Sequence, residues 1–147
     1  MAGAVNFVYT LVMKIITQLK KKDLLGKKVL ARVDFNVPIK KGKVIDGFRI
    51  EQSLPTINYL LENEARVILV SHLGSDGSAS LAPVARYLNK FFTIKLAKNF
   101  DDIKFSPATP RAHLRSGGEV VLLENIRRYA GEQKNDHKFA KQLSELA

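Results

Sequence analysis

Hydrophobic residues along the chain form short continuous runs that alternate with longer segments, in which apolar residues recur every three or four positions. The continuous runs lie at 28–35, 66–71, 93–96 and 119–123. Such runs predict buried strands, whereas the longer spacing predicts helices at 49–61 and 81–92 and a last helix capped by Asp136. Strands that alternate with helices predict an α/β domain, whose mainly parallel sheet is covered by helices on both faces.

Proline, glycine and small polar residues mark the connections between these elements. Residues 40–47 form a charged segment with two glycines, which predicts a loop. Ser80 is expected to cap the helix that follows it, and Pro55 to lie near the start of its helix or to kink it. A short helix interrupted by Pro110 is expected at 107–114.

Length and composition fit one globular core in a chain of 147 residues, 46% of them hydrophobic. The net charge of +10 suits a phosphate-bearing ligand, nucleic acid or an anionic membrane equally well. The absence of cysteine excludes disulfides, thiolate nucleophiles and Cys-ligated zinc, and fits a cytoplasmic protein. Because no two of the three histidines are spaced i, i+4, no metal site is expected.

The first nineteen residues are largely apolar, but they match neither a spanning helix nor a signal peptide. The uncharged part ends at Met13, which is too short to span a bilayer. The lysines Lys20, Lys21 and Lys22 follow the apolar stretch, whereas a signal peptide carries its positive charge first. We therefore expect residues 1–12 to be a nonstructural extension and residues 13–147 to form the domain, with no membrane partner.

Polar clusters follow three of the predicted strands, and in an open parallel sheet such clusters meet at the carboxyl edge, where ligands bind. Asp34 and Asn36 lie two residues apart, so both side chains leave the same face. Arg49 begins a helix, where the helix dipole favours an anion rather than a cation. A bound phosphate facing Arg49 would account for a cation at this position. His72 and Arg127 complete a candidate site for one anionic small molecule.

Each of these side chains also has a structural interpretation that spacing alone leaves open. Asp34 and Asn36 are common turn formers, and Arg49 could face solvent. His72 could bond a backbone carbonyl, and one of the two arginines Arg127 and Arg128 could be only solvated. An aspartyl-phosphate mechanism like that of haloacid dehalogenase-like phosphatases is disfavoured, because it usually requires a second aspartate as the acid at the position of Asn36.

In order along the chain, these clusters resemble the signatures of phosphoglycerate kinase. The segment KKVLARVDFNVP at 27–38 looks very like the opening signature of that family. The resemblance continues through DGFRI at 46–50, LPTI at 54–57, SHLG at 71–74, SLAPVA at 80–85 and VLLENIR at 121–127. It covers roughly residues 15–147.

The resemblance implies a Rossmann-like three-layer domain and reversible phosphoryl transfer between ATP and the carboxylate of 3-phosphoglycerate, a step of glycolysis. Asp34 and Asn36 would contact the hydroxyl and carboxylate region of 3-phosphoglycerate or 1,3-bisphosphoglycerate. His72 and Arg127 would hold the 3-phosphate, and Arg49, the catalytic residue, would reach toward the transferring phosphoryl group. Magnesium ATP or ADP would bind a separate C-terminal domain, and the full-length protein would be a monomer.

The sequence departs from the family pattern at several positions. Ser75 and Asp76 stand where the family has Arg-Pro, and Arg128 replaces an aromatic residue. The domain is expected to be incomplete at its C-terminal end, with hinge and nucleotide domain missing, so that this fragment alone is inactive. A noncatalytic anion-binding relic of the domain is the alternative. A basic nucleic-acid-binding module is favoured only by the net charge, and no nucleic-acid partner is expected.

Overall fold

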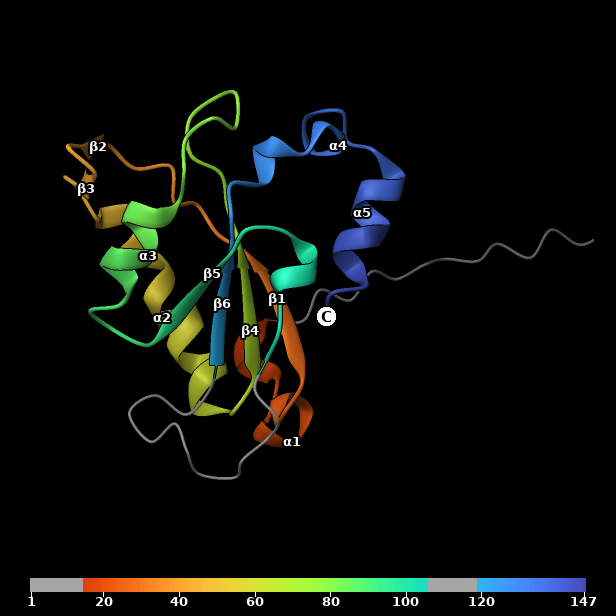
Figure 1. Cartoon of the computed structure of the whole chain (residues 1–147). Helices are drawn as coiled ribbons and strands as arrows, with labels where there is room; N and C mark the ends of the chain where they lie inside the picture. Colours follow the sequence, from red (N-terminus) through yellow and green to blue (C-terminus); the bar gives the residue numbers. More distant parts are fainter. Residues whose placement is uncertain (1–14, 106–118) are drawn as a thin grey trace, which may run out of the picture.

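Four parallel strands form the central sheet of the structure, a computed structural model that describes residues 15–105 and 119–147. The strands are β1 (Lys28–Arg32), β4 (Arg66–Val70), β5 (Ile94–Ala97) and β6 (Glu119–Leu123), in the order β1-β4-β6-β5. All neighbouring strands are parallel, so their carboxyl ends meet at one edge, the upper edge in Figure 1. The α/β fold with a mainly parallel sheet, predicted from the sequence, is confirmed.

Helices cover the sheet from both sides. On one side lie α2 (Phe48–Glu62) and α3 (Ala82–Leu88), and on the other lies α5 (His137–Ser144), as Figure 1 shows. The remaining elements are short: η1 (Ile16–Gln18), α1 (Lys21–Leu24), β2 (Ile39–Lys40), β3 (Lys43–Val44), η2 (Phe100–Asp102), η3 (Ile126–Arg128) and α4 (Ala130–Gln133). None of the helices in the described ranges is long and apolar enough to cross a membrane.

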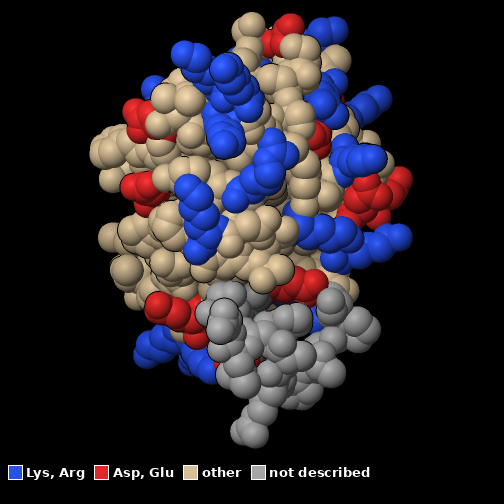
Figure 2. All heavy atoms as spheres, turned by 60° about the vertical axis from the view of Figure 1, so that its left-hand side comes forward, with Lys and Arg blue, Asp and Glu red and all other residues tan. Residues whose placement is uncertain are grey.

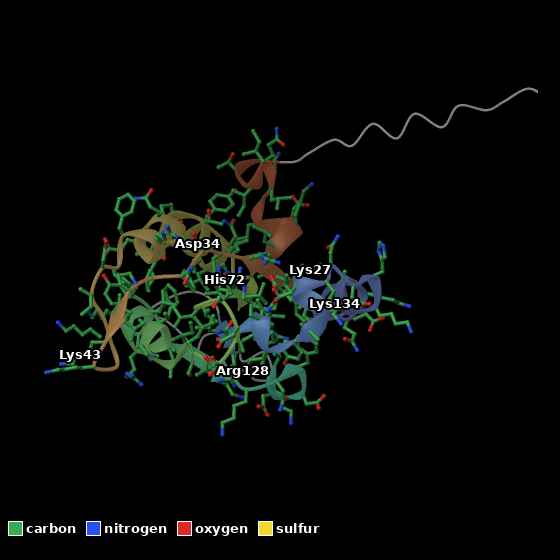
Figure 3. The ribbon with its side chains drawn as sticks, turned by 90° about the horizontal axis from the view of Figure 1, so that it is seen from above. Lys27, Asp34, Lys43, His72, Arg128 and Lys134 are labelled. Carbon is green, nitrogen blue, oxygen red and sulfur yellow. The ribbon has the colours of Figure 1, made fainter. Side chains whose placement is uncertain are left out.

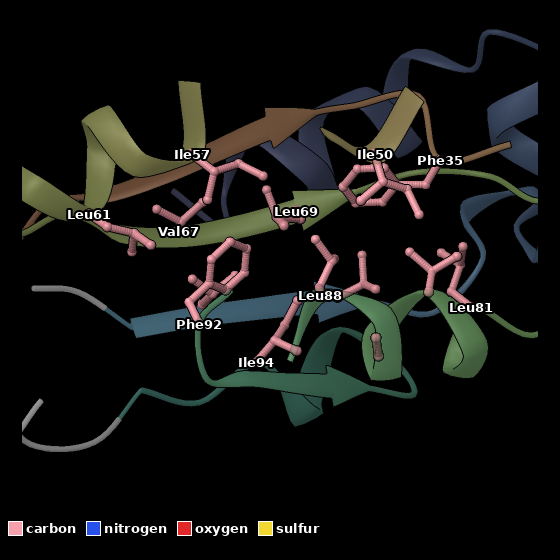
Figure 4. Packing of buried hydrophobic residues seen from close by; sticks show 14 of the residues in the cluster. Phe35, Ile50, Ile57, Leu61, Val67, Leu69, Leu81, Leu88, Phe92 and Ile94 are labelled. Carbon is pink, nitrogen blue, oxygen red and sulfur yellow. The ribbon is translucent and has the colours of Figure 1, made fainter. Parts of the chain in front are cut away.

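Alternating side chains of the strands divide the hydrophobic core between the two faces. On β4, Val67 and Leu69 point into the cluster formed with α2 and α3, whereas Ile68 and Val70 belong to the cluster on the other face. Figure 4 shows the first cluster, in which Ile57 of α2 packs near Val67. Because both faces are buried, the strand sequence is almost continuously apolar. Packing on both faces holds the sheet in place, and with it the edge that carries the polar loops.

Several element boundaries differ from those predicted. The first strand ends at Arg32, not at 35, because the backbone N–H of Phe35 donates to the hydroxyl of Ser71 (2.9 Å) and leaves the ladder. The β2–β3 hairpin occupies residues 39–44 and so overlaps the loop predicted at 40–47; its turn holds Lys41 and Gly42 at positive φ. Lys-Gly is a weaker hairpin signal than Asn-Gly, which is why the sequence did not predict it.

Two helices also differ in detail from the prediction. Pro55 lies in the interior of α2 rather than near its start. The N-cap of α3 is Leu81 rather than Ser80, whose hydroxyl donates to Glu124 (2.7 Å) and accepts from the N–H of Ala82 (3.1 Å). The helix also ends at Leu88, four residues before the predicted end at 92. The expected helix at 107–114 and the extension at 1–12 lie outside the described residues.

Asp136 caps α5 as predicted, because its carboxylate accepts from the N–H of Phe139 (2.9 Å). We expect Asp136→Ala to lower the free energy of unfolding by about 1 kcal/mol, since the mutant helix loses that cap. Urea denaturation measures the change. Lys138→Ala, on the same helix, is the control and should change stability little; an equal loss in both variants would contradict the capping role.

Candidate functional site

The loops after β1, β4 and β6 meet at the carboxyl edge of the sheet, and Gly74 joins them. The N–H of Gly74 donates to the side-chain oxygen of Asn36 (3.1 Å). The carbonyl of Gly74 accepts from the Nη1 of Arg127 (2.8 Å). One residue of the middle loop therefore contacts a candidate side chain from each neighbouring loop.

Asp34 and Arg49 form an ion pair beside this junction. The Nη1 of Arg49 lies 2.9 Å from the Oδ2 of Asp34, and both side chains are more than half exposed. The other carboxylate oxygen of Asp34 accepts from the N–H of Asn36 (3.1 Å), so Asp34 also has the turn-forming role that the sequence left open. Because an exposed pair of this kind adds little stability, Arg49 is held in place without being committed to Asp34.

His72 lies among charged groups that follow β1 and β6 or end β1, and Figure 3, which looks down on the molecule from above, shows it near Asp34. Its pKa lies below the usual 6.5, first because of burial and then because of Arg127 and, more weakly, Arg32. Asp34 and Glu132 oppose that shift. The imidazole is therefore mainly neutral at pH 7 in the free protein, so it offers one N–H donor, and a bound anion would favour its protonation.

A third arginine, Arg32, reaches the same region, and sequence reasoning missed it. Its Nη2 donates to the Oε1 of Glu132 (2.6 Å), while the Nε of Arg127 lies 3.9 Å from the Oε2 of that carboxylate. The available signal was spacing: Arg32, Asp34 and Asn36 follow one another at intervals of two where a strand ends.

Three polar residues of the predicted clusters are scaffold rather than site. Ser71, Glu124 and Asn125 are all buried. Glu124 accepts from the N–H of Leu81 (2.7 Å), and Asn125 donates to the carbonyl of Leu73 (2.7 Å). These bonds fix the loop between β4 and α3, which carries His72 and Gly74.

Positive charge extends beyond this edge. Figure 2 shows Lys and Arg side chains spread over the face toward α2 and α3, separated by uncharged atoms. In Figure 3, Lys43 and Lys134 lie on opposite sides of the molecule. The net charge is thus shared between the candidate site and the rest of the surface. No group of three or more His, Cys, Asp or Glu that could hold a metal is found among residues 15–105 and 119–147.

Comparison with known proteins identifies the family. The model of the family described as phosphoglycerate kinase matches residues 19–147. The chain belongs to the phosphoglycerate kinase family. Phosphoglycerate kinase of Pelotomaculum thermopropionicum is 47% identical over 130 residues, which are 85% of this chain and 33% of that protein. The enzyme of Dictyoglomus turgidum is 45% identical over 138 residues, 91% of this chain and 35% of its own length.

Solved structures of the family have the same fold. Phosphoglycerate kinase from Coxiella burnetii superposes with a TM-score of 0.69 and 37% sequence identity, over 84% of this chain and 31% of that one. The structure from Pyrococcus horikoshii gives a TM-score of 0.64 and 29% identity, over 84% of this chain and 33% of that one. The chain spans about a third of the length of the curated relatives it matches.

The loop at 74–80, where the sequence departs from the family pattern, packs tightly on η3. Gly77 has a φ of +78°, and a Cβ there would lie 2.6 Å from the backbone of Arg127 and Arg128. Arg128 in turn donates from its Nε to the carbonyl of Gly77 (3.3 Å). Ser75 is exposed, and its carbonyl lies 3.5 Å from the Nε2 of Gln133. The loop is therefore anchored to the strand-end turn that carries Arg127, although Ser75 adds no cation.

Proposed function

We propose that this chain is the phosphoglycerate-binding part of a phosphoglycerate kinase, and that 3-phosphoglycerate or 1,3-bisphosphoglycerate binds at the carboxyl edge of the sheet. The observation that carries the proposal is the junction at Gly74, which brings Asn36 and Arg127 together from two loops. Together with His72 and Arg49 they offer donors and positive charge to one small anion. A bidentate guanidinium is well suited to a phosphate or carboxylate.

The roles we assign follow the family resemblance. Arg127 and His72 bind the 3-phosphate, and Asp34 and Asn36 bind the hydroxyl and carboxylate region. Arg49 is the catalytic residue, because a guanidinium that leaves Asp34 can neutralise charge on the transferring phosphoryl group. Phosphoryl transfer depends mainly on positioning and on charge neutralisation, so a site of this kind needs no covalent group.

The rest of the reaction belongs to the proposal as well. Reversible transfer between ATP and 3-phosphoglycerate requires a magnesium nucleotide, which we assign to the C-terminal domain of the family, outside this sequence. That nucleotide supplies or accepts the phosphoryl group when it is bound. We expect the complete protein to be a cytoplasmic monomer and this chain alone to be inactive.

Calorimetric titration of 3-phosphoglycerate into the 147-residue chain tests the proposal. We expect saturable binding at one site, and Arg127→Gln to weaken it by about one to two orders of magnitude, since a hydrogen bond to a charged group contributes about 1.5–3 kcal/mol. Arg86→Gln is the matched control, because Arg86 donates to the carbonyl of Gly42 at the β2–β3 hairpin. No saturable heat, or equal losses in both variants, would refute the proposal.

The alternative is a noncatalytic anion-binding relic, and Ser75, which stands where the family pattern has an arginine, favours it. Such a relic would no longer be under selection to bind phosphoglycerate, and it would bind inorganic phosphate as tightly as 3-phosphoglycerate. Competition between the two ligands in the same titration separates these functions. A phosphoglycerate site should prefer 3-phosphoglycerate, which makes more hydrogen bonds there.

A further inference from the structure

Glu132 places a nearly buried carboxylate between two arginines of the candidate site. Its side chain is 9% exposed, and its two oxygens face different partners: Arg32 at the end of β1 and Arg127 in η3. The hydrogen bond from Arg32 is short, at 2.6 Å, whereas the Nε of Arg127 lies 3.9 Å away. One carboxylate thus faces guanidinium groups from two elements that are far apart in the sequence.

The backbone that carries Glu132 is fixed by packing. Glu132 lies in α4, which contacts both η3 and α5. The preceding residue, Gly131, lies so close to α5 that a Cβ would meet the Cβ of Phe139 at 2.6 Å. The carboxylate is therefore presented from a defined position, and a side chain held in this way orients its partners at little entropic cost.

Arg127 depends on such a partner. Its Nε is buried and has no hydrogen-bond partner among the described residues, while its Nη1 is bonded to the carbonyl of Gly74. Two guanidinium groups in one region also repel each other. The negative charge of Glu132 offsets that repulsion and faces the Nε of Arg127, so that Arg32 and Arg127 can stay near each other before any ligand arrives.

We propose that Glu132 is a positioning residue of the anion site, which holds the guanidinium groups of Arg32 and Arg127 side by side at the carboxyl edge of the sheet. The proposal takes only the identity of the ligand, 3-phosphoglycerate, from the proposed function. It assigns Glu132 no contact with that ligand. It holds that the carboxylate of Glu132, which accepts from Arg32, keeps that guanidinium beside Arg127.

The sign of the effect separates positioning from net charge. Replacing Glu132 with glutamine makes the site one unit more positive, so charge alone predicts tighter binding of an anion. Positioning predicts the opposite, because the arginines lose the group that orients them and must be ordered by the ligand itself. Weaker binding despite added positive charge is therefore the signature of a positioning residue.

The first test is calorimetric titration of 3-phosphoglycerate into the full chain. We expect Glu132→Gln to weaken binding by about tenfold. Glu132→Asp keeps the charge but cannot reach both arginines, so an intermediate loss is expected, and it decides the question if Glu132→Gln fails to fold. Glu64→Gln removes a carboxylate that pairs with Lys21 away from the site, and it should leave affinity unchanged. Equal or tighter binding in both Glu132 variants would overturn the proposal.

The second test needs no ligand and therefore survives a failure of the proposed function. The Nε hydrogen of Arg127 should exchange slowly with water in the parent chain, because the atom is buried. Arg127→Lys removes its resonance and so assigns it. Exchange is expected to be about tenfold faster in Glu132→Gln and unchanged in Glu64→Gln. If the parent chain binds no 3-phosphoglycerate, the proposed function fails and this exchange rate decides the inference; unchanged exchange in Glu132→Gln would overturn it.

Discussion

Asn125→Leu is expected to lower the free energy of unfolding by about 4 kcal/mol, because it leaves several buried backbone groups without partners. Asn125 is fully buried, and its Nδ2 donates to the carbonyls of Leu73 (2.7 Å) and Ala79 (2.8 Å). Its Oδ1 accepts from the N–H of Arg127 (3.2 Å). A leucine of similar size can replace none of these bonds.

Urea denaturation of the parent chain and the variant measures this loss. Asn99→Leu is the matched control, because Asn99 also bonds a backbone N–H, that of Asp102, but is exposed. We expect the control to lose no more than about 1 kcal/mol. Asn125→Asp should fall between the two, since it retains the acceptor and loses both donors. Losses of similar size at Asn99 and Asn125 would show that Asn125 does not hold the loop.

The two central strands, β4 and β6, could be predicted from the sequence because both of their faces are buried. The strand at 119–123 has the predicted bounds, and the strand predicted at 66–71 ends one residue earlier, at Val70. Double burial produces continuous apolar runs, which local patterns detect well. The β2–β3 hairpin has two residues in each strand, so it offers no such pattern.

The candidate site was only partly accessible to the same reasoning. Asp34, Asn36, Arg49, His72 and Arg127 were singled out because each lies in a signature or at an element's end; their roles in binding and catalysis stay predictions. Arg32 and Glu132 are 100 residues apart in the sequence and meet only in the fold, so no local spacing reveals their ion pair.

The sequence alone did not reveal which polar residues of these clusters hold the loops, for a related reason. Ser71, Glu124 and Asn125 lie in the same sequence clusters as His72 and Arg127, and only burial distinguishes the two groups. The scaffold residues bond the backbone of the loops, whereas the candidate site residues keep much of their hydrogen-bonding capacity for a ligand. A polar cluster at a strand end thus combines a functional group with the groups that hold it.

Glu124 should make the stability of this loop depend on pH. The pKa of its carboxyl lies below the usual 4.5. Burial alone would raise that pKa, but it is outweighed by hydrogen bonds from the backbone N–H groups of Leu81 and Asn125, then by the hydroxyl of Ser80 and the charge of Arg128. A carboxylate whose pKa is lowered by folding stabilises the protein fully above its unfolded pKa. That contribution to stability is lost as the pH falls below about 4.5, the pKa in the unfolded chain, and then through the lower pKa of the folded protein.

Glu124→Gln is therefore expected to cost about 3 kcal/mol at pH 7, where the parent has charge-assisted hydrogen bonds that the amide cannot match. The gap between parent and variant should narrow as the pH falls below 4.5, because protonation removes the same charge from the parent. Urea midpoints between pH 7 and pH 3 measure this gap. The control, Glu64→Gln, alters an exposed pair with Lys21 and should differ little from the parent at any pH. If the difference in stability between the parent and Glu124→Gln stayed constant down to pH 3, the ionised carboxylate would not be its cause.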